Sequence, residues 1–167
     1  MADQDFTLTQ EYLQSIFEYK DGNLYWKKSL GIRSVIGRIA GGLHKPSGYF
    51  QTQISGKKYK THRLIFLFHH GYIPKIIDHI DNNPANNCIE NLREATQQEN
   101  CFNSKKRKHN TSGYKNVVWH DSGKKWAVRL FINGSNKHFG LYFDKEVANF
   151  VAETMRYKYH KKFSNNG

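Results

Sequence analysis

Residues 76–100 constrain the fold of this chain more than any other stretch. Thr96 and Glu99 have the spacing of a capping box, in which two side chains satisfy the free backbone N–H groups at the start of a helix. Short apolar segments and a loop rich in Asn, Asp and Pro precede this helix start. The pattern predicts a strand at 75–80, a loop at 81–87, a second strand at 92–95 and a helix from Thr96. We therefore expect a small α+β unit here.

Three polar residues of this unit could carry chemistry. Asp78 and His79 are adjacent on the first expected strand, so they point to opposite faces unless the strand twists or bulges there. Asn100 lies on the first turn of the expected helix, and in a tight hairpin it could form a two-oxygen site with Asp78. Oxygen ligands favour Mg²⁺ or Mn²⁺, and His79 could act as a general base near neutral pH. A structural histidine beside an ordinary Asn-rich turn remains the alternative.

Positive charge is distributed unevenly around this unit. The chain has 167 residues, with 26 Lys and Arg against 14 Asp and Glu, and a formal charge of +12. Residues 1–60 carry +4, residues 61–104 carry −2 and residues 105–167 carry +10. Basic flanks suit nucleic-acid phosphates, and a slightly acidic centre suits a divalent cation. The distribution therefore favours an enzyme that acts on a phosphodiester over a simple nucleic-acid coat.

Several other classes of protein do not fit the sequence. The longest apolar run, at 64–68, is far shorter than the roughly 20 residues that span a bilayer, so no membrane partner is expected. The acidic, polar first residues predict no secretory signal. Cys88 and Cys101 do not form a C-x-x-C pair, so neither a disulfide scaffold nor a four-cysteine zinc site is indicated. A cytoplasmic location is the expectation.

The N-terminal part predicts further small elements ahead of this unit. Turn residues and alternating apolar positions divide it into short strands, and two segments have helical spacing. The Gly-rich residues 29–47 are expected to be irregular. The expected elements are a helix at 9–17 capped by Thr7 or Thr9, a hairpin turning at Asp21-Gly22, strands at 48–54 and 57–60, and a buried helix at 62–70 ended by Gly71.

Three separated blocks within residues 62–103 resemble the HNH nuclease motif of phage and intron homing endonucleases. The blocks are Asp78-His79-Ile80-Asp81, Asn86-Asn87-x-x-Glu90-Asn91-Leu92-Arg93 and Thr96-x-x-Glu99-Asn100. The resemblance implies a ββα-metal hairpin that cleaves DNA, with His79 as the general base that activates water. It implies that Asp78 and Asn100 bind the divalent cation. It also implies that Asn91 holds the loop and orients His79 by hydrogen bonding, a role for which Asn87 is a rival.

A basic run marks the end of this region. We interpret residues 105–111 as a linker that follows DNA phosphates, although such a run can also be a nuclear-localisation patch. Its four cationic residues are Lys105, Lys106, Arg107 and Lys108.

The remainder predicts three strands followed by a helix. The strands are expected at 114–120, 125–132 and 136–142, with turns between them, and Asp144 is expected to cap a helix that runs to about His160. Five residues form the expected stripe of this helix, namely Val147, Phe150, Val151, Thr154 and Tyr157. Trp126 and Phe150 are both expected in the core.

This segment is similar, over residues 110–163, to the ethylene-response-factor type of DNA-binding domain. The matching blocks are Ser112-Gly113-Tyr114-Lys115-Asn116-Val117-Val118-Trp119, Lys125-Trp126-Ala127-Val128-Arg129 and Phe139-Gly140-x-Tyr142-Phe143, followed by the helix with Ala148. The resemblance implies a three-stranded antiparallel sheet packed on one helix, with the sheet in the DNA major groove. Plant members carry more arginines on the sheet, so their base-reading residues do not transfer directly.

Strand alternation suggests which side chains would face DNA. One face of the middle strand, Trp126, Val128, Leu130 and Ile132, should pack on the helix, and the other, Lys125, Ala127, Arg129 and Phe131, should face DNA. Arg129 could read guanine. The expected phosphate contacts, which could also be ordinary solvated charges, are Lys115, Lys124, Lys125, Lys137 and His138.

The sequence therefore predicts an α+β protein in three parts. Residues 1–104 hold the HNH hairpin and an N-terminal α/β extension, 105–111 form the linker, and 112–167 form the C-terminal sheet and helix. The expected function is a site-directed endonuclease of double-stranded DNA, located in the host cytoplasm if a phage encodes it. As a monomer it would nick one strand, and a dimer would be needed to cut both. The alternatives are a non-catalytic DNA-binding regulator with a structural hairpin, and an RNA-binding or RNA-processing protein.

Overall fold

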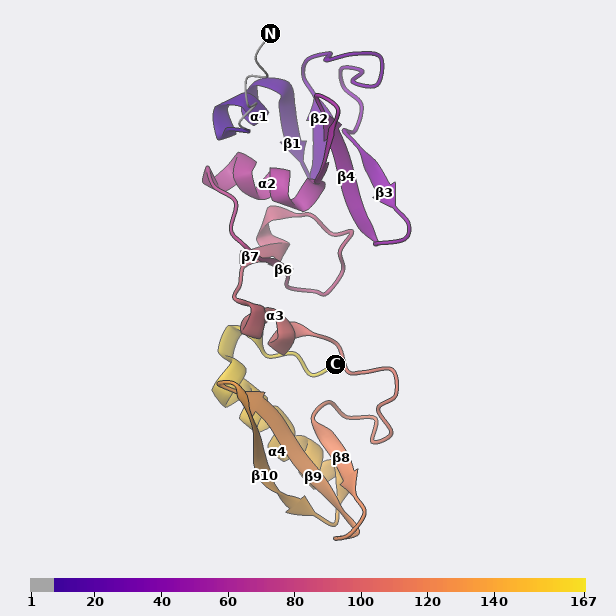
Figure 1. The fold of residues 1–167 in the computed structure, drawn as a ribbon, viewed down its shortest axis with the longest axis vertical. Helices are drawn as coiled ribbons and strands as arrows, with labels where there is room; N and C mark the ends of the chain where they lie inside the picture. Colours follow the sequence, from indigo (N-terminus) through magenta and orange to yellow (C-terminus); the bar gives the residue numbers. More distant parts are fainter. Residues whose placement is uncertain (1–7) are drawn as a thin grey trace. The chain divides into compact units, whose positions relative to one another are not determined.

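The computed structural model describes residues 8–167, which form two compact units, Met1–Ala95 and Thr96–Gly167 (Figure 1). Within these residues the fold is a mixed α+β architecture with several small antiparallel sheets and four α-helices, as the sequence predicts. The division falls ahead of the basic run, so the helix that begins after Thr96 groups with the C-terminal unit. The domain bounds 1–104, 105–111 and 112–167 stay a prediction about independent folding.

The first unit contains two α-helices and seven short strands. Each sheet is antiparallel: β1 pairs with β2, β4 lies between β3 and β5, and β6 pairs with β7. The elements are α1 (Gln10–Ile16), β1 (Phe17–Lys20), β2 (Asn23–Trp26), β3 (Gly42–His44), β4 (Tyr49–Ile54), β5 (Lys57–Lys60), α2 (Thr61–His70), β6 (Ile77–His79), the 3₁₀-helix η1 (Ile89–Asn91) and β7 (Leu92–Glu94).

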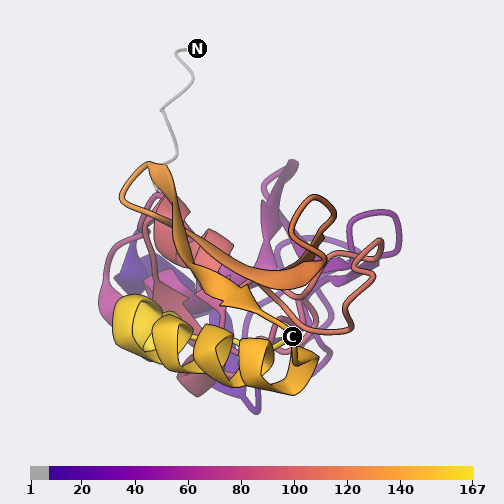
Figure 2. The same ribbon diagram turned by 90° about the horizontal axis from the view of Figure 1, so that it is seen from below.

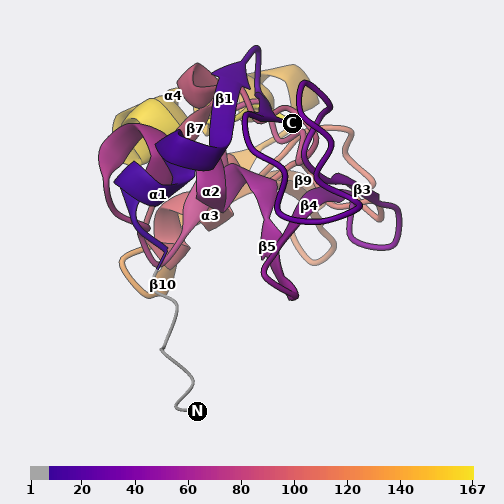
Figure 3. The same ribbon diagram turned by 90° about the horizontal axis from the view of Figure 1, so that it is seen from above.

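Local chemistry explains the ends of both helices. The Thr9 hydroxyl accepts a hydrogen bond from the Tyr12 backbone N–H and caps α1, whereas Thr7 lies outside the described residues. Gly71 ends α2 in the left-handed region, at φ 77°, where a residue without Cβ fits without strain. The two helices pack against each other (Figure 3). Their buried side chains share one core with β1 and β2, which includes Leu13, Phe17, Leu24, Leu64 and Ile65.

Part of the Gly-rich segment 29–47 is more ordered than the sequence predicts. They contain β3, and residues 37–40 form backbone hydrogen bonds with β2. Gly41 is required where β3 begins, because its φ is +97° and a Cβ there would lie 2.2 Å from the Gln51 carbonyl oxygen. The expectation of an irregular segment is therefore confirmed for most of these residues and is wrong only at β3 and the bridge at Ile39, where backbone pairing, which composition does not report, orders the chain.

The hairpin formed by β1 and β2 contacts the segment that precedes β7, at Cys88 and Ile89. The Tyr19 hydroxyl accepts a hydrogen bond from the Ile89 backbone N–H at 2.9 Å. Gly22, in the turn of the hairpin, approaches so closely that a Cβ would lie 2.8 Å from the Cys88 nitrogen. The N-terminal extension therefore supports the position of the Asn-rich loop.

The second unit is a three-stranded sheet with a long helix on one face. The strand order is β10-β9-β8, with both pairs antiparallel, and α4 crosses one face of this sheet (Figure 2). Its elements are α3 (Gln97–Asn103), β8 (Val117–His120), β9 (Lys125–Ile132), β10 (Ser135–Tyr142), α4 (Lys145–His160) and the 3₁₀-helix η2 (Lys161–Phe163). Thr96 and Glu99 form the predicted capping box of α3, and Asp144 caps α4 as predicted. The predicted arrangement of three strands and a helix is confirmed.

The outward face of α4 differs from the prediction. The expected stripe includes three of the most exposed apolar side chains of this unit, with Phe150 71%, Tyr157 79% and Val147 48% exposed. The buried residues of α4 are Ala148, Ala152, Arg156 and His160. Val151 of the expected stripe packs against the core, so only Val147, Phe150 and Tyr157 of the large apolar residues in that stripe lie on the exposed side. Phe150 is therefore not a core residue, whereas Trp126 is half-buried against the core as expected.

Alternation along β9 follows the prediction closely. Val128, Leu130 and Ile132 are buried, and Arg129 and Phe131 are exposed. Ala127, expected to face outward, is fully buried between its cross-strand neighbours Val118 and Leu141. None of the helices in the described part of the chain is long and apolar enough to cross a membrane.

Candidate functional site

The β6–β7 pair brings together the first two blocks of the predicted motif. Its register places Asp78 opposite Arg93 and His79 opposite Leu92. Asp78 is 4% exposed and His79 is 6% exposed, so both polar side chains are buried at adjacent positions of one short strand. Buried polar groups require partners, and those partners define the site.

His79 has a polar partner from the loop and ring partners from the N-terminal extension. Its Nε2 lies 3.3 Å from the Asn87 side-chain oxygen. Its ring centroid lies 5.0 Å from that of His62 on α2, in an edge-to-face contact, and 5.9 Å from that of Tyr49 on β4. Burial lowers the pKa of His79, and the Asn87 hydrogen bond opposes that shift. The imidazole is therefore neutral near pH 7 and able to accept a proton.

Asn87, and not Asn91, makes the hydrogen bond described for His79. Asn91 holds the loop instead: its side-chain nitrogen donates to Asp81 Oδ1 and to the Asn86 carbonyl, both at 2.9 Å. Its side-chain oxygen accepts from the Asp81 backbone N–H at 3.1 Å. Asn91 thus makes the loop contacts that were predicted for it, but the hydrogen bond to His79 comes from Asn87. Spacing did not decide between them because both lie within five residues in the connection between β6 and β7.

Asp78 is paired with a residue that the sequence reasoning did not select. Arg93 Nε and Nη2 each lie 2.8 Å from Asp78 Oδ2. The Arg93 side chain is 14% exposed and the Asp78 side chain is 5% exposed. The signal that could have identified Arg93 is the cross-strand register, which places residues 78 and 93 opposite each other once the hairpin is drawn.

His62 is a second residue that the sequence reasoning missed. It is 5% exposed, and its Nδ1 is a buried atom without a hydrogen-bond partner. Burial, and then the neighbouring His79, Lys60 and Arg63, lower the pKa of His62 to about 3. Tyr49 lies between β5 and this ring pair, with its centroid 5.2 Å from His62 and the Lys60 Nζ 4.4 Å above its face. The rings of His62 and Tyr49 therefore contact each other and both contact the ring of His79.

The site offers a cation one buried carboxylate, that of Asp78. In residues 8–167 no group of three or more His, Cys, Asp or Glu side chains gathers as a metal site would require. A single buried carboxylate, Asp78, fits Mg²⁺ or Mn²⁺, which keep several waters and need few protein ligands. Asn100 lies on α3 in the second unit, so its pairing with Asp78 around a cation stays a prediction.

Most of the predicted DNA-contacting residues lie on the surface of the second unit. Arg129 is exposed on the outer face of the sheet opposite His138, and Lys137 is exposed on β10. Lys125 is half-buried, with Nζ 4.2 Å from the centre of the Phe143 ring. The basic run is exposed throughout, namely Lys105, Lys106, Arg107 and Lys108, and Lys106 Nζ donates to the Gly113 carbonyl at 2.8 Å.

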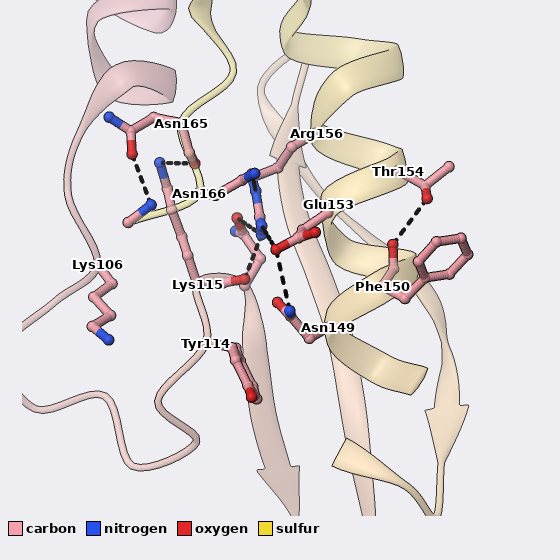
Figure 4. Close-up of polar contacts among 12 residues, drawn as sticks. Lys106, Tyr114, Lys115, Asn149, Phe150, Glu153, Thr154, Arg156, Asn165 and Asn166 are labelled. Atoms are coloured by element: carbon pink, nitrogen blue, oxygen red, sulfur yellow. Dashed lines mark hydrogen bonds and ion pairs between the residues drawn. The ribbon is translucent and has the colours of Figure 1, made fainter. Parts of the chain in front are cut away.

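Lys115 is placed differently from its expected role. It is buried, and its Nζ donates to the carbonyls of Phe102, Ser104 and Asn165 at 2.8, 2.5 and 3.1 Å. Burial, and then the nearby Arg156, lower the pKa of Lys115 to about 8. Figure 4 shows its side chain reaching the C-terminal segment beside Arg156. Its ammonium thus joins α3 to the end of the chain, and we exclude it from the proposed DNA surface.

A family model described as HNH endonuclease matches residues 59–101, which include His62, Asp78, His79, Asn91 and Asn100. No solved structure matches the chain. Protein 3.8 of Escherichia phage T7 is 35% identical over 107 residues, which cover 63% of this chain and 88% of that protein. The HNH match implies endonuclease activity on DNA, and the identity with the phage protein extends beyond the motif. The chain therefore belongs to the family of the phage T7 Protein 3.8 and contains an HNH endonuclease domain.

Proposed function

We propose that this protein is a site-directed, metal-dependent DNA endonuclease in which His79 is the general base. The observation that carries the proposal is the buried His79, hydrogen-bonded to Asn87 and adjacent to Asp78, within the HNH match. A buried imidazole with a lowered pKa, next to a buried carboxylate on a three-residue strand, is the kind of arrangement that functional sites contain.

The Asn87 contact sets the tautomer of His79. An amide oxygen only accepts hydrogen bonds, so the proton lies on Nε2 and the basic lone pair lies on Nδ1. The neutral ring then removes a proton from water that attacks the phosphorus. The low pKa of His79 keeps this ring deprotonated at neutral pH, and the loop bonds of Asn91 hold Asn87 and its neighbours in place.

Asp78 and Asn100 are the proposed cation ligands. A bound Mg²⁺ or Mn²⁺ would supply positive charge to the pentavalent transition state and to the leaving oxygen. Asp78 contributes the charged oxygen and Asn100 a neutral one, and both are hard donors.

The C-terminal unit is the proposed sequence-reading part. Its three-stranded sheet, with α4 on one face, leaves the other face for the major groove, as in the ethylene-response-factor type of domain. Arg129 is the candidate for guanine contact because it is exposed on that face and Arg binds guanine through two hydrogen bonds. The proposed phosphate contacts are Lys125, Lys137, Lys105, Lys106, Arg107 and Lys108. One hairpin provides one active site, so a monomer is expected to nick one strand.

The test is cleavage of supercoiled plasmid by dilute protein with Mg²⁺ or Mn²⁺. The wild type should produce nicked circles, EDTA should abolish them, and His79→Ala should reduce the rate by at least roughly 100-fold, because a general base contributes that much. His44→Ala removes an exposed histidine from the same unit and should leave the rate unchanged.

Three outcomes would contradict parts of the proposal. Equal activity in the wild type and His79→Ala would remove His79 from the reaction. DNA binding without cleavage under any metal condition would identify a DNA-binding regulator. Linear DNA produced by the monomer without a nicked intermediate would contradict single-strand nicking.

A further inference from the structure

Arg93 binds one oxygen of the carboxylate that the proposed function assigns to the cation. Two of its nitrogens bind the same oxygen, Asp78 Oδ2, at 2.8 Å each, from the facing strand. The pair is short, charge-assisted and largely shielded from water, with side-chain exposures of 14% and 5%. A divalent cation that binds this oxygen must therefore compete with a positive charge already held there.

Desolvation makes this competition strong. A carboxylate and a guanidinium that are both largely out of water stabilise each other, because each offsets part of the cost of burying the other charge. Replacement of the guanidinium by a cation at Asp78 is therefore favoured when Arg93 gains another anion. DNA supplies one, since a phosphodiester in the site carries a negative charge beside the cation.

We propose that Arg93 is the counter-ion of Asp78 that a divalent cation displaces, and that the released guanidinium then binds a phosphate oxygen of the bound DNA strand. This inference rests on the proposed function. The exchange couples cation binding to DNA binding. Without DNA the cation binds weakly, because Arg93 competes for Asp78. With DNA the cation binds more tightly, because a phosphate oxygen binds the displaced Arg93 guanidinium. The guanidinium suits both partners, because it can donate two N–H groups at once to the oxygens of a carboxylate or a phosphate.

The position of Arg93 supports this second contact. It lies on β7, which directly follows the Asn-rich loop and pairs with the strand that carries His79. Its side chain is more exposed than that of Asp78, so the guanidinium lies nearer to solvent than the carboxylate it binds. Rotation about its flexible stem could carry it to a DNA phosphate without a change in the backbone.

The decisive measurement is Mn²⁺ binding to the full chain without DNA, by calorimetry or electron paramagnetic resonance, for the wild type and Arg93→Gln. If Arg93 competes with the cation, its removal should tighten Mn²⁺ binding by about tenfold, and Mn²⁺ should raise the Tm of Arg93→Gln more than that of the wild type. Arg38→Gln removes the same charge from an exposed position of the same unit and should leave Mn²⁺ affinity unchanged.

Nicking should change in the opposite direction. At saturating Mn²⁺, Arg93→Gln should nick roughly 100-fold more slowly, because a charged donor to the phosphate is lost. Tighter metal binding combined with slower cleavage is the specific signature of the exchange. A residue that only supported the fold would weaken both.

Two further variants keep the test informative. If Arg93→Gln does not fold, as judged by circular dichroism, Arg93→Lys retains a charge for Asp78 but not the two parallel bonds, and should show Mn²⁺ affinity above wild type with slower nicking. The double variant Asp78→Asn with Arg93→Gln has no charge at either position. It should lack the tighter Mn²⁺ binding expected of Arg93→Gln alone, because the carboxylate that would bind Mn²⁺ is gone.

The outcomes separate this inference from the proposed function. Unchanged or weaker Mn²⁺ binding in both Arg93 variants, with an active wild type, would overturn the inference and leave the nuclease proposal standing. Tighter binding with an unchanged nicking rate would overturn the phosphate contact. A wild type that binds Mn²⁺ but never nicks DNA would contradict the proposed function.

Discussion

At the scale of single residues, the site depends on which of two nearby asparagines contacts His79, the proposed general base. Asn87 and Asn91 both lie in the connection between β6 and β7, yet Asn87 contacts His79 and Asn91 binds Asp81 and Asn86. An orienting residue should affect the rate of the chemical step, and a residue that organises a loop should affect stability. Variants of the two asparagines can therefore be told apart by measuring both quantities.

We expect Asn87→Ala to reduce the nicking rate constant by roughly 10- to 100-fold, the usual effect of removing a partner that orients a reacting group, with a small change in Tm. Asn91→Ala removes three hydrogen bonds and should lower the free energy of unfolding by about 1–3 kcal/mol. Single-turnover cleavage and urea denaturation provide the two measurements. A larger stability loss for Asn87→Ala than for Asn91→Ala would reverse these assignments.

At the scale of elements, α4 shows why a hydrophobic pattern located a helix without locating its buried face. Its capping residue and length follow from the sequence, because Asp144 and the helical spacing are local signals. Val147, Phe150 and Tyr157 of the expected stripe are exposed, whereas Ala148 and Ala152 are fully buried and Val151 packs against the core. A stripe chosen by hydrophobicity alone therefore does not identify the buried face of this helix.

A pair of substitutions on α4 tests this reversal. Phe150→Ser should change the free energy of unfolding by less than about 0.5 kcal/mol, since the ring is mostly exposed. Ala152→Leu adds volume to a fully buried position and should destabilise the protein by about 1–3 kcal/mol. Chemical denaturation measures both variants. If Phe150→Ser were the more damaging change, the outward placement of the aromatic face would be wrong.

At the scale of the whole molecule, the predicted motif is divided between two compact units. Its first two blocks lie in Met1–Ala95, and its third block begins at Thr96. Two contacts attach α3 to the rest of the second unit. The ring of Phe102 stacks on that of His160, with 3.7 Å between the ring centroids. Lys115 Nζ donates hydrogen bonds to carbonyls at the end of α3 and in the C-terminal segment. Arg156 extends this network by donating to the Lys115 carbonyl and to Asn166 (Figure 4).

Each unit buries a histidine that resists protonation, so we expect the stability of both units to fall in acid. Burial is the main cause that lowers the pKa of His62 to about 3 and that of His160 to about 4, from an ordinary value of 6.5. The unfolded chain therefore binds protons first as the pH falls below about 6.5, and each histidine lowers the free energy of unfolding by about 1.4 kcal/mol per pH unit below that value. The loss should continue to about pH 4 for His160 and about pH 3 for His62.

Urea denaturation at pH 7 and pH 5 provides the measurement for this expectation. His62→Phe and His160→Phe should each flatten the pH dependence, because phenylalanine has no proton to bind. His44→Phe, at an exposed position, should leave it as in the wild type. An unchanged slope in both buried variants would mean that these histidines titrate normally in the folded protein.

The sequence by itself determined the order of the elements, the caps of α3 and α4, the strand–loop–strand motif and the candidate pair Asp78 and His79. These features depend on residues close together in the chain: a capping side chain binds N–H groups one turn away, and strand alternation has a period of two. The tertiary structure alone decided that His62 and Tyr49 lie beside His79, that Arg93 holds Asp78, that Lys115 is buried and that α4 presents its alanines to the sheet. Those contacts depend on strand register and on the fit of side-chain volumes between distant segments, which no local pattern encodes.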